Sequence, residues 1–144
     1  MLLCEVVTPT KLLYHGQASL VEVPSVDGRF GVLPGHCMLS CRMESGVVTV
    51  YTDEAQKEKL EFASFMGFAQ VNEDKVTILS REGILRSEID TAKVKADLED
   101  IKAKMAALTP EEQDEMKNRA NEVIRHTYVD DINWLETQLK VAEG

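Results

Sequence analysis

Residues 23–36 read Val-Pro-Ser-Val-Asp-Gly-Arg-Phe-Gly-Val-Leu-Pro-Gly-His, and this stretch determines how the first half of the chain is interpreted. It holds two prolines and three glycines in a short span. Glycine adopts positive φ values without a steric penalty, and proline fixes φ, so residues of this kind mark tight turns. The segment therefore predicts turns between neighbouring strands.

Short apolar runs surround this turn-rich segment throughout residues 1–88. They are rich in β-branched and aromatic residues, as strands are, and they occupy residues 3–7, 20–23, 47–51, 60–65, 68–71 and 76–79. Pro24 is expected to end one run, Gly67 separates two others, and residues 72–75 form a polar turn. Many short strands separated by turns predict an all-β N-terminal domain, a sandwich or barrel, over residues 1–88.

The pattern changes after residue 88, where glycine is absent until Gly144 and alanine, lysine and glutamate dominate. Apolar residues then recur at spacings of three and four, which predicts a helix. This first stripe consists of Val94, Leu98, Ile101, Met105 and Leu108. Thr109 and Pro110 restart the chain as an N-cap and a first helical position. A second stripe consists of Met116, Ala120, Val123, Thr127, Ile132, Leu135, Leu139 and Ala142.

Two striped helices joined by a tight turn predict an α-helical antiparallel hairpin over residues 89–144. The second stripe steps by one residue near Tyr128, which leaves open a short break around residues 126–131. The stripes are narrow, and they fit packing on each other, on the β domain or on a partner helix. Because burial of these side chains offsets the entropy of ordering the hairpin only in part, we expect a marginally stable element.

Acidic residues outnumber basic ones, with 25 Asp and Glu against 16 Lys and Arg in 144 residues, and the net charge is -9. Nucleic acids and anionic membrane surfaces are bound through Lys and Arg, so this balance argues against both as partners. No apolar run approaches the ~20 residues of a membrane helix. Residues 1–5 lack the basic region of a signal peptide, and we expect no leader.

Candidate catalytic and metal-binding groups are sparse. The three cysteines are odd in number, which indicates reduced thiols in a cytosolic setting. His36, Cys37 and Cys41 lie close together in sequence, yet a structural zinc site usually takes four ligands and no fourth is evident. Residues 28–31 lack the Gly-Lys-Ser/Thr ending of a phosphate-binding loop. The sequence thus predicts no catalytic residue, metal or cofactor, with a small metal- or thiol-dependent enzyme as the alternative.

Apolar residues within the opening segment favour an interaction role over a catalytic one. They are Val26, Phe30, Val32 and Leu33. Such side chains either fill the end of the β core or form an exposed rim that meets a partner, and both interpretations stay open. The partner would belong to a larger assembly, or the chain would be a stand-alone binding module that dimerises through its helices.

A series of landmarks runs in order through nearly the whole chain. They are residues 5–9, Tyr14-His15-Gly16, residues 27–36 with Pro34-Gly35-His36, Ser45-Gly46, Gly67-Phe68-Ala69-Gln70-Val71, residues 76–79 and residues 139–142. This series resembles the epsilon subunit of the F-type ATP synthase, which is called delta in mitochondria. The resemblance implies a β-sandwich of about ten strands followed by the helical hairpin. It also implies a non-catalytic central-stalk, or rotor, subunit that couples ion translocation to ATP synthesis.

The resemblance further implies partners and a location. The β-sandwich would bind the gamma subunit of the stalk and the membrane-embedded c-ring. The hairpin would either fold against the sandwich or extend toward the catalytic alpha/beta head and hinder ATP hydrolysis. Such a subunit would lie at the cytoplasmic face of the bacterial cell membrane, held there through the complex.

Candidate site residues carry over from the resemblance by position. The loop that would face the c-ring or stalk comprises Val26, Asp27, Gly28, Arg29, Phe30 and His36. Arg29 stands where some relatives have an acid. On the second helix, Arg119 and Arg125 would pair with acids of a catalytic subunit, or they would simply face solvent.

Several bacterial relatives bind ATP on the folded hairpin, through an Ile/Leu-Asp-x-x-Arg motif on the first helix and arginines on the second. This chain has Ile89, Asp90 and Lys93 at the first motif, and lysine cannot form arginine's bidentate fork with phosphate. The arginine positions of the second helix fall near Trp134 and Gln138. We therefore expect ATP binding that is weak or absent.

Overall fold

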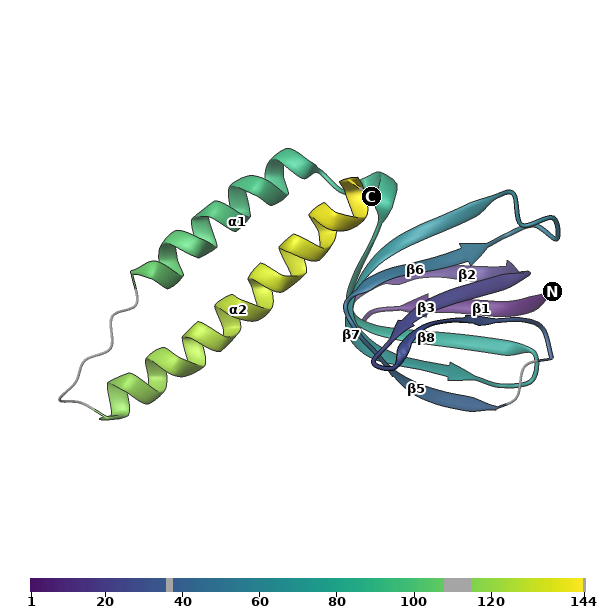
Figure 1. Ribbon diagram of the computed structural model, residues 1–144, viewed down its shortest axis with the longest axis horizontal. Helices are drawn as coiled ribbons and strands as arrows, with labels where there is room; N and C mark the ends of the chain where they lie inside the picture. The colour runs from purple at the N-terminus through teal and green to yellow at the C-terminus, as the bar shows by residue number, and fades with distance from the viewer. Residues whose placement is uncertain (36–37, 108–114, 144) are drawn as a thin grey trace.

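The computed structural model describes residues 1–35, 38–107 and 115–143, which form a strand-built body and two helices (Figure 1). The strands are β1 (Leu2–Val7), β2 (Leu12–Ala18), β3 (Leu20–Ser25), β4 (Gly28–Val32), β5 (Leu39–Met43), β6 (Gly46–Tyr51), β7 (Lys59–Val71) and β8 (Lys75–Leu85). A short 3-10 turn, η1 (Arg86–Glu88), leads to α1 (Thr91–Ala106) and α2 (Glu115–Glu143). The predicted order, a β-sandwich followed by two helices, is confirmed.

The two longest strands, β7 and β8, each belong to both layers of the sandwich. Residues 59–64 of β7 pair with β6, whereas residues 67–71 pair with β5. Residues 75–79 of β8 pair with β1, and residues 82–85 pair with the first half of β7. One layer is therefore β2-β1-β8-β7-β5, and the other is β4-β3-β6-β7-β8. The described chain has eight strands rather than about ten, because β7 and β8 each contribute to two layers.

A bend at Gly67 carries β7 from one layer to the other. The runs predicted as two strands, 60–65 and 68–71, are thus one strand with an irregular step where Gly67 has φ +149°. A β-carbon at Gly67 would lie 1.9 Å from the carbonyl oxygen of Leu79. The buried hydroxyl of Ser80 accepts a hydrogen bond from the Phe65 N–H at 3.3 Å and donates to the Glu82 carbonyl, so it replaces ladder bonds lost at the bend.

The core lies between the two layers and consists mainly of β-branched side chains. Its members include Leu2, Cys4, Val6, Val21, Val23, Val32, Met43, Val48, Val50, Phe62, Ala69, Val71, Val76 and Ile78. These residues alternate with half-buried ones along β1 and β3, as expected for strands that are fully buried on one face only. Burial raises the pKa of the Cys4 thiol to about 12, so this cysteine is a packing residue.

The strand around Pro24 runs further than predicted. β3 continues through Pro24 to Ser25, because Pro24 pairs with Arg29 of β4 and its carbonyl accepts a hydrogen bond from the Glu44 N–H at 3.0 Å. Proline fits a strand wherever its missing N–H is not required by the ladder.

The helices form an antiparallel pair, with α1 packed along the C-terminal half of α2 (Figure 1). Val94 of α1 is buried, as are Ile132, Leu135 and Val141 of α2. Lys95 pairs with Glu143 and Lys102 pairs with Glu136, each at 3.6 Å. Two ion pairs therefore join α1 to α2. The C-terminal half of the second stripe therefore packs with the first stripe and beside β7, whereas Val123 and Thr127 of its first half are exposed.

The sequence also left open a short break in the second helix around residues 126–131. α2 is unbroken from 115 to 143, and no interruption occurs at residues 126–131. The hydroxyl of Thr127 donates to the Val123 carbonyl at 3.1 Å, within the helix. The predicted restart at Thr109 and Pro110 lies outside the described residues.

Candidate functional site

The turn between β3 and β4 carries the first group of predicted site residues. Ser25 Oγ accepts a hydrogen bond from the Asp27 N–H at 3.2 Å and donates to the Gly28 carbonyl at 2.6 Å, and Gly28 adopts φ +115°. Val26 is 52% exposed, so it forms part of a rim rather than of the core. This turn lies at the end of the sandwich that faces α2.

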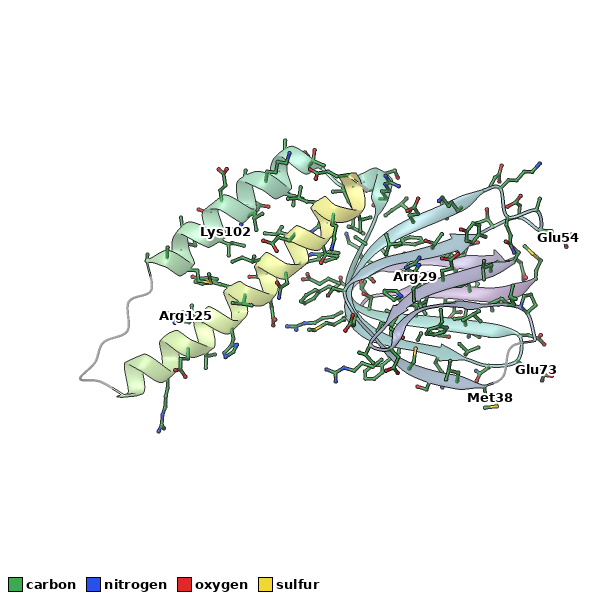
Figure 2. The ribbon with its side chains drawn as sticks, viewed as in Figure 1. Arg29, Met38, Glu54, Glu73, Lys102 and Arg125 are labelled. Carbon is green, nitrogen blue, oxygen red and sulfur yellow. The ribbon has the colours of Figure 1, made fainter. Side chains whose placement is uncertain are left out.

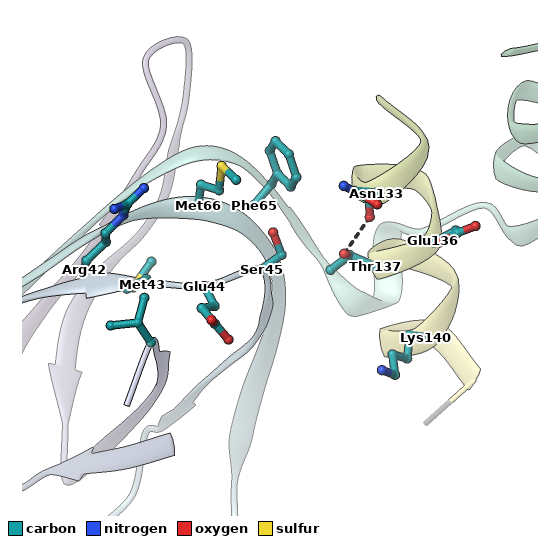
Figure 3. A pocket seen from close by; sticks show the side chains of 11 residues that line it. Arg42, Met43, Glu44, Ser45, Phe65, Met66, Asn133, Glu136, Thr137 and Lys140 are labelled. Carbon is teal, nitrogen blue, oxygen red and sulfur yellow. Dashed lines mark hydrogen bonds between the residues drawn. The ribbon is translucent and has the colours of Figure 1, made fainter. Parts of the chain in front are cut away.

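Figure 3 shows the cavity that this turn shares with α2, with a volume of about 490 Å³. The sandwich contributes Val26, Arg42, Met43, Glu44, Ser45, Phe65 and Met66, and α2 contributes Asn133, Glu136, Thr137 and Lys140. Cations and carboxylates occur on both walls. The lining of the cavity therefore has no net preference for a ligand of one charge. We interpret the cavity as the gap left between the sandwich and the hairpin where they meet.

Arg29 is tied to the sandwich rather than held out toward a partner. Its Nε donates to Glu22 at 3.1 Å, and one terminal nitrogen donates to Thr49 Oγ1 at 2.9 Å. The other terminal nitrogen donates to the Val47 carbonyl. The guanidinium thus links β3, β4 and β6 across the outer face of one layer. Phe30, next to Arg29, is half-buried against the core.

His36 lies outside the described residues, but its neighbours mark the opposite end of the sandwich. The Gly35 N–H donates to the Glu73 carbonyl at 3.2 Å. Figure 2 shows Met38 and Glu73 together at the end remote from the helices. The five residues of β4 separate this end from the Val26 turn, a distance of about 15 Å. The Val26 turn therefore lies at one end of the sandwich and the described neighbours of His36 lie at the other, so these two segments do not form one patch.

The residues that match the nucleotide motif have structural roles here. Asp90 is the N-cap of α1, and its carboxylate accepts a hydrogen bond from the Lys93 N–H at 3.2 Å. Gln138 is buried, and Trp134 packs against Phe65 with ring centroids 6.1 Å apart. Near Trp134, a hollow between the helices is lined by Ile101, Leu135 and Trp134 together with three acids and one lysine, which are Asp97, Asp100, Asp131 and Lys104.

Arg119 and Arg125 both have exposed side chains on the first half of α2, which extends beyond the sandwich (Figure 1). Exposed apolar residues accompany them, namely Val123, Ile124 and Val129. The structure therefore leaves this part of the hairpin accessible.

The seam between α2 and the sandwich is a small cluster centred on Phe65. Arg81 lies 5.8 Å from the centre of the Phe65 ring and forms an ion pair with Asp130 of α2 at 3.5 Å. Trp134 packs against the same ring. Burial raises the pKa of the Glu82 carboxyl, and the nearby Asp131 of α2 adds to this.

Sequence reasoning missed an exposed apolar row across the outer face of the β2-β1-β8-β7-β5 layer. Four side chains stand side by side in the strand register: Leu12 opposite Val7, Val7 opposite Leu79, and Leu79 opposite Phe68. Leu12 is 64% exposed, Phe68 56% and Leu79 47%. A register shift in β1 after Val6 places Leu12 in this row. Only pairing between strands shows it, because the four residues lie on four different strands.

Polar groups border this apolar row, as at protein interaction sites. The adjacent register positions hold Ser40, Gln70, Thr77, Glu5 and His15. Glu5 pairs with Lys75 at 3.5 Å and with His15 at 3.3 Å. Arg42 lies opposite Phe68 in the register.

No cluster of metal-ligating side chains and no membrane-spanning helix occurs in the part of the chain that the structure describes. No group of three or more His, Cys, Asp or Glu side chains gathers within residues 1–35, 38–107 and 115–143. His36 and Cys37 of the proposed metal cluster lie outside those ranges, and burial raises the pKa of the Cys41 thiol. None of the described helices is long and apolar enough to cross a membrane.

Comparison with known proteins gives the family. Residues 1–86 match the model of the ATP synthase delta/epsilon chain, β-sandwich domain. The chain belongs to this family. It is 33% identical to the ATP synthase epsilon chain of Magnetococcus marinus over 97% of its own length and 93% of that protein. It is 40% identical to the epsilon chain of Corynebacterium glutamicum over 65% of its length and 75% of that protein.

Solved structures of the ATP synthase share the fold of this delta/epsilon family member. A chain of the mitochondrial ATP synthase of Euglena gracilis superposes with a TM-score of 0.62 at 23% identity, covering 96% of this chain and 81% of that one. A chain from the central stalk and c-ring of the Tetrahymena thermophila enzyme gives 0.54 at 14% identity, covering 97% and 95%. The sequence-based identification of the family is therefore confirmed, and the chain is an epsilon-type subunit of ATP synthase rather than its catalytic chain.

Proposed function

We propose that this chain is a non-catalytic central-stalk subunit that couples ion translocation to ATP synthesis by binding other subunits. Membership of the epsilon-type family supports the assembly. The observation that carries the interaction role is the apolar row formed by Leu12, Val7, Leu79 and Phe68, in which all but the half-buried Val7 are exposed. A partner that covers this row removes it from water.

The partners we propose are the gamma subunit and the c-ring. The related Tetrahymena chain comes from a structure of central stalk and c-ring, which supports this pairing. Two ends and one face of the sandwich are available for contacts: the Val26 turn, the Met38 end and the apolar row. We also propose a peripheral position at the cytoplasmic face of the bacterial cell membrane, held there through these partners.

The hairpin has the features of a regulatory element. It contacts the sandwich through the C-terminal half of α2, and its first half projects with exposed apolar and arginine side chains. We propose that the hairpin leaves this position, reaches the catalytic alpha/beta head and hinders ATP hydrolysis, with Arg119 and Arg125 as candidate contacts.

Binding of ATP to the hairpin is proposed to be weak or absent. The acids at the inter-helix hollow repel phosphate, and Trp134 and Gln138 supply no positive charge. Calorimetry of the full-length chain with ATP is expected to show no micromolar affinity. A Kd in the micromolar range would overturn this part of the proposal.

The proposed function is tested by assembly and hydrolysis together. The tagged full-length chain should co-purify with the gamma subunit and the catalytic head. Complexes that contain residues 1–86 only should hydrolyse ATP faster than complexes with the full chain. A chain that fails to join gamma would refute the stalk role, whereas equal hydrolysis rates would refute only the inhibitory role of the hairpin.

A further inference from the structure

We propose that Gln138 of α2 promotes release of the hairpin. Its side-chain amide is buried without a protein partner while α2 is docked, and it gains hydrogen bonds with water when α2 moves away. The inference rests on the proposed function, because it names the residue that keeps the docked position of the hairpin marginally stable. It concerns the docked state of the chain itself and requires no ligand.

Gln138 occupies an apolar position in the helix. Buried residues follow one another at spacings of three along the C-terminal half of α2, namely Ile132, Leu135, Gln138 and Val141. Gln138 is 7% exposed, the same fraction as Val141. The residues three and four positions away, which are its neighbours on the helix surface, are all apolar: Trp134, Leu135, Val141 and Ala142. The amide therefore meets apolar side chains where it requires hydrogen-bond donors and acceptors.

Gln138 differs in this respect from the other buried polar side chains of the described residues. The others lie in the sandwich and each makes a hydrogen bond; they are Thr8, Ser19, Ser25, Thr49, Ser64 and Ser80. The Gln138 side chain makes no hydrogen bond to another residue of the described chain. A buried amide without a partner gives up its hydrogen bonds to water and gains none in return, so it opposes docking.

Gln138 lies where three parts of the molecule meet. Trp134, one turn before it, packs against Phe65 of the sandwich. Leu135 lines the hollow that α2 shares with α1, and Ala142 lines a cavity beside η1. Because Gln138 lies between these residues on the helix, movement of α2 away from the sandwich, α1 or η1 exposes its amide to water. Each of these movements therefore removes the cost of burying the amide.

Charged contacts across the same interfaces add little stability to the docked hairpin. The two ion pairs that join α1 to α2 have side chains that are 52–61% exposed. The pair between Arg81 and Asp130, which joins the sandwich to α2, has side chains that are 60% and 40% exposed. Ion pairs in contact with water contribute little to stability. Apolar packing around Phe65 thus holds α2 in place, and the buried amide of Gln138 acts against it.

The test measures hydrogen exchange at the backbone amides of residues 132–141 in the isolated full-length chain. Gln138→Leu replaces the amide with an apolar group and should slow this exchange about tenfold, because the docked state becomes more stable. Gln138→Glu should accelerate it at least tenfold at neutral pH, because an unpaired carboxylate is costlier to bury than an amide. The matched control is Asn133→Leu, which removes an exposed amide from the same helix and should change exchange less than twofold.

Two further measurements separate release of the hairpin from a general loss of stability. The amides of β6 in the sandwich should exchange at the same rate in all variants. The emission of Trp134 should shift to longer wavelength in Gln138→Glu, as its ring leaves Phe65. Faster exchange of residues 132–141 in Gln138→Leu than in the wild type would overturn the inference, because it would show that the amide holds α2 in place, for example through a bound water. Unchanged exchange in Gln138→Leu would overturn it as well.

Hydrolysis by assembled complexes distinguishes this inference from the proposed function. A hairpin that stays docked is withheld from the catalytic head, so complexes with Gln138→Leu should hydrolyse ATP faster than complexes with the wild-type chain. Slower hydrogen exchange together with unchanged hydrolysis would support the role of Gln138 and refute the inhibitory role of the hairpin. Unchanged exchange in a chain that still assembles with gamma would refute the role of Gln138 and leave the stalk function standing.

Discussion

Replacement of Gly67 by alanine is expected to cost roughly 4 kcal/mol or more of folding free energy, enough to leave much of the protein unfolded or insoluble. Gly67 has φ +149°, which is costly for any residue with a β-carbon. In addition, that β-carbon would lie 1.9 Å from the Leu79 carbonyl oxygen. Backbone atoms cannot rotate away as a side chain can, so β7 and β8 must separate where both cross between layers.

Gly28→Ala is the matched control for this substitution. Gly28 also has a positive φ, +115°, but nothing lies within 4 Å of its would-be β-carbon. Gly28→Ala should therefore lose only about 1–3 kcal/mol of folding free energy, the cost of placing alanine at a positive φ. Denaturant unfolding of both full-length variants measures the difference. Equal losses at the two positions would show that close approach of β7 and β8 is not what requires glycine at 67.

Substitution of Phe65 by alanine is expected to release α2 from the sandwich. Phe65 is 3% exposed, and it contacts Trp134 of α2 and Arg81, which itself pairs with Asp130. Loss of this ring removes the centre of the seam, at a cost of about 3 kcal/mol to docking. Because Trp134 is the one tryptophan of the chain, its fluorescence should shift to longer wavelength as it becomes exposed to water.

Phe68→Ala is the matched control for this second prediction. Phe68 lies on the same strand but is 56% exposed on the outer face. Its removal should leave the tryptophan emission unchanged. Arg81→Ala should give a smaller shift than Phe65→Ala, since it removes an exposed ion pair and one contact with the ring. An unchanged emission spectrum in Phe65→Ala would contradict the assignment of Phe65 as the centre of the seam.

Local patterns predicted β1, β3, β6, β7, β8 and both helices, but no predicted run covers β2, β4 or β5. The β-branched run at 47–51 is β6, the turn at 72–75 joins β7 to β8, and the stripe from Val94 lies on α1. Errors arose at Pro24 and Gly67, where residues that usually end strands lie within them. In both cases pairing with a neighbouring strand overrides the local preference.

The candidate site was harder to predict than the fold. Val26 and the neighbours of His36 are near in sequence but lie at opposite ends, because the straight β4 separates them. Conversely, Leu12 and Phe68 are far apart in sequence and lie in one row, because three strand pairings join them. A polypeptide pattern gives the spacing of residues along one strand but not which strands become neighbours.

The sequence by itself determined the β-sandwich, the two helices, the acidic balance and the resemblance to an ATP synthase subunit. These depend on turn residues, hydrophobic periodicity and composition, which act over a few residues at a time. Only the tertiary structure decided that β7 and β8 bend through both layers, that Phe65 holds α2, and that an apolar row crosses four strands. Those features arise from long-range strand pairing and packing. The spacing of residues along the chain does not determine which strands become neighbours in space.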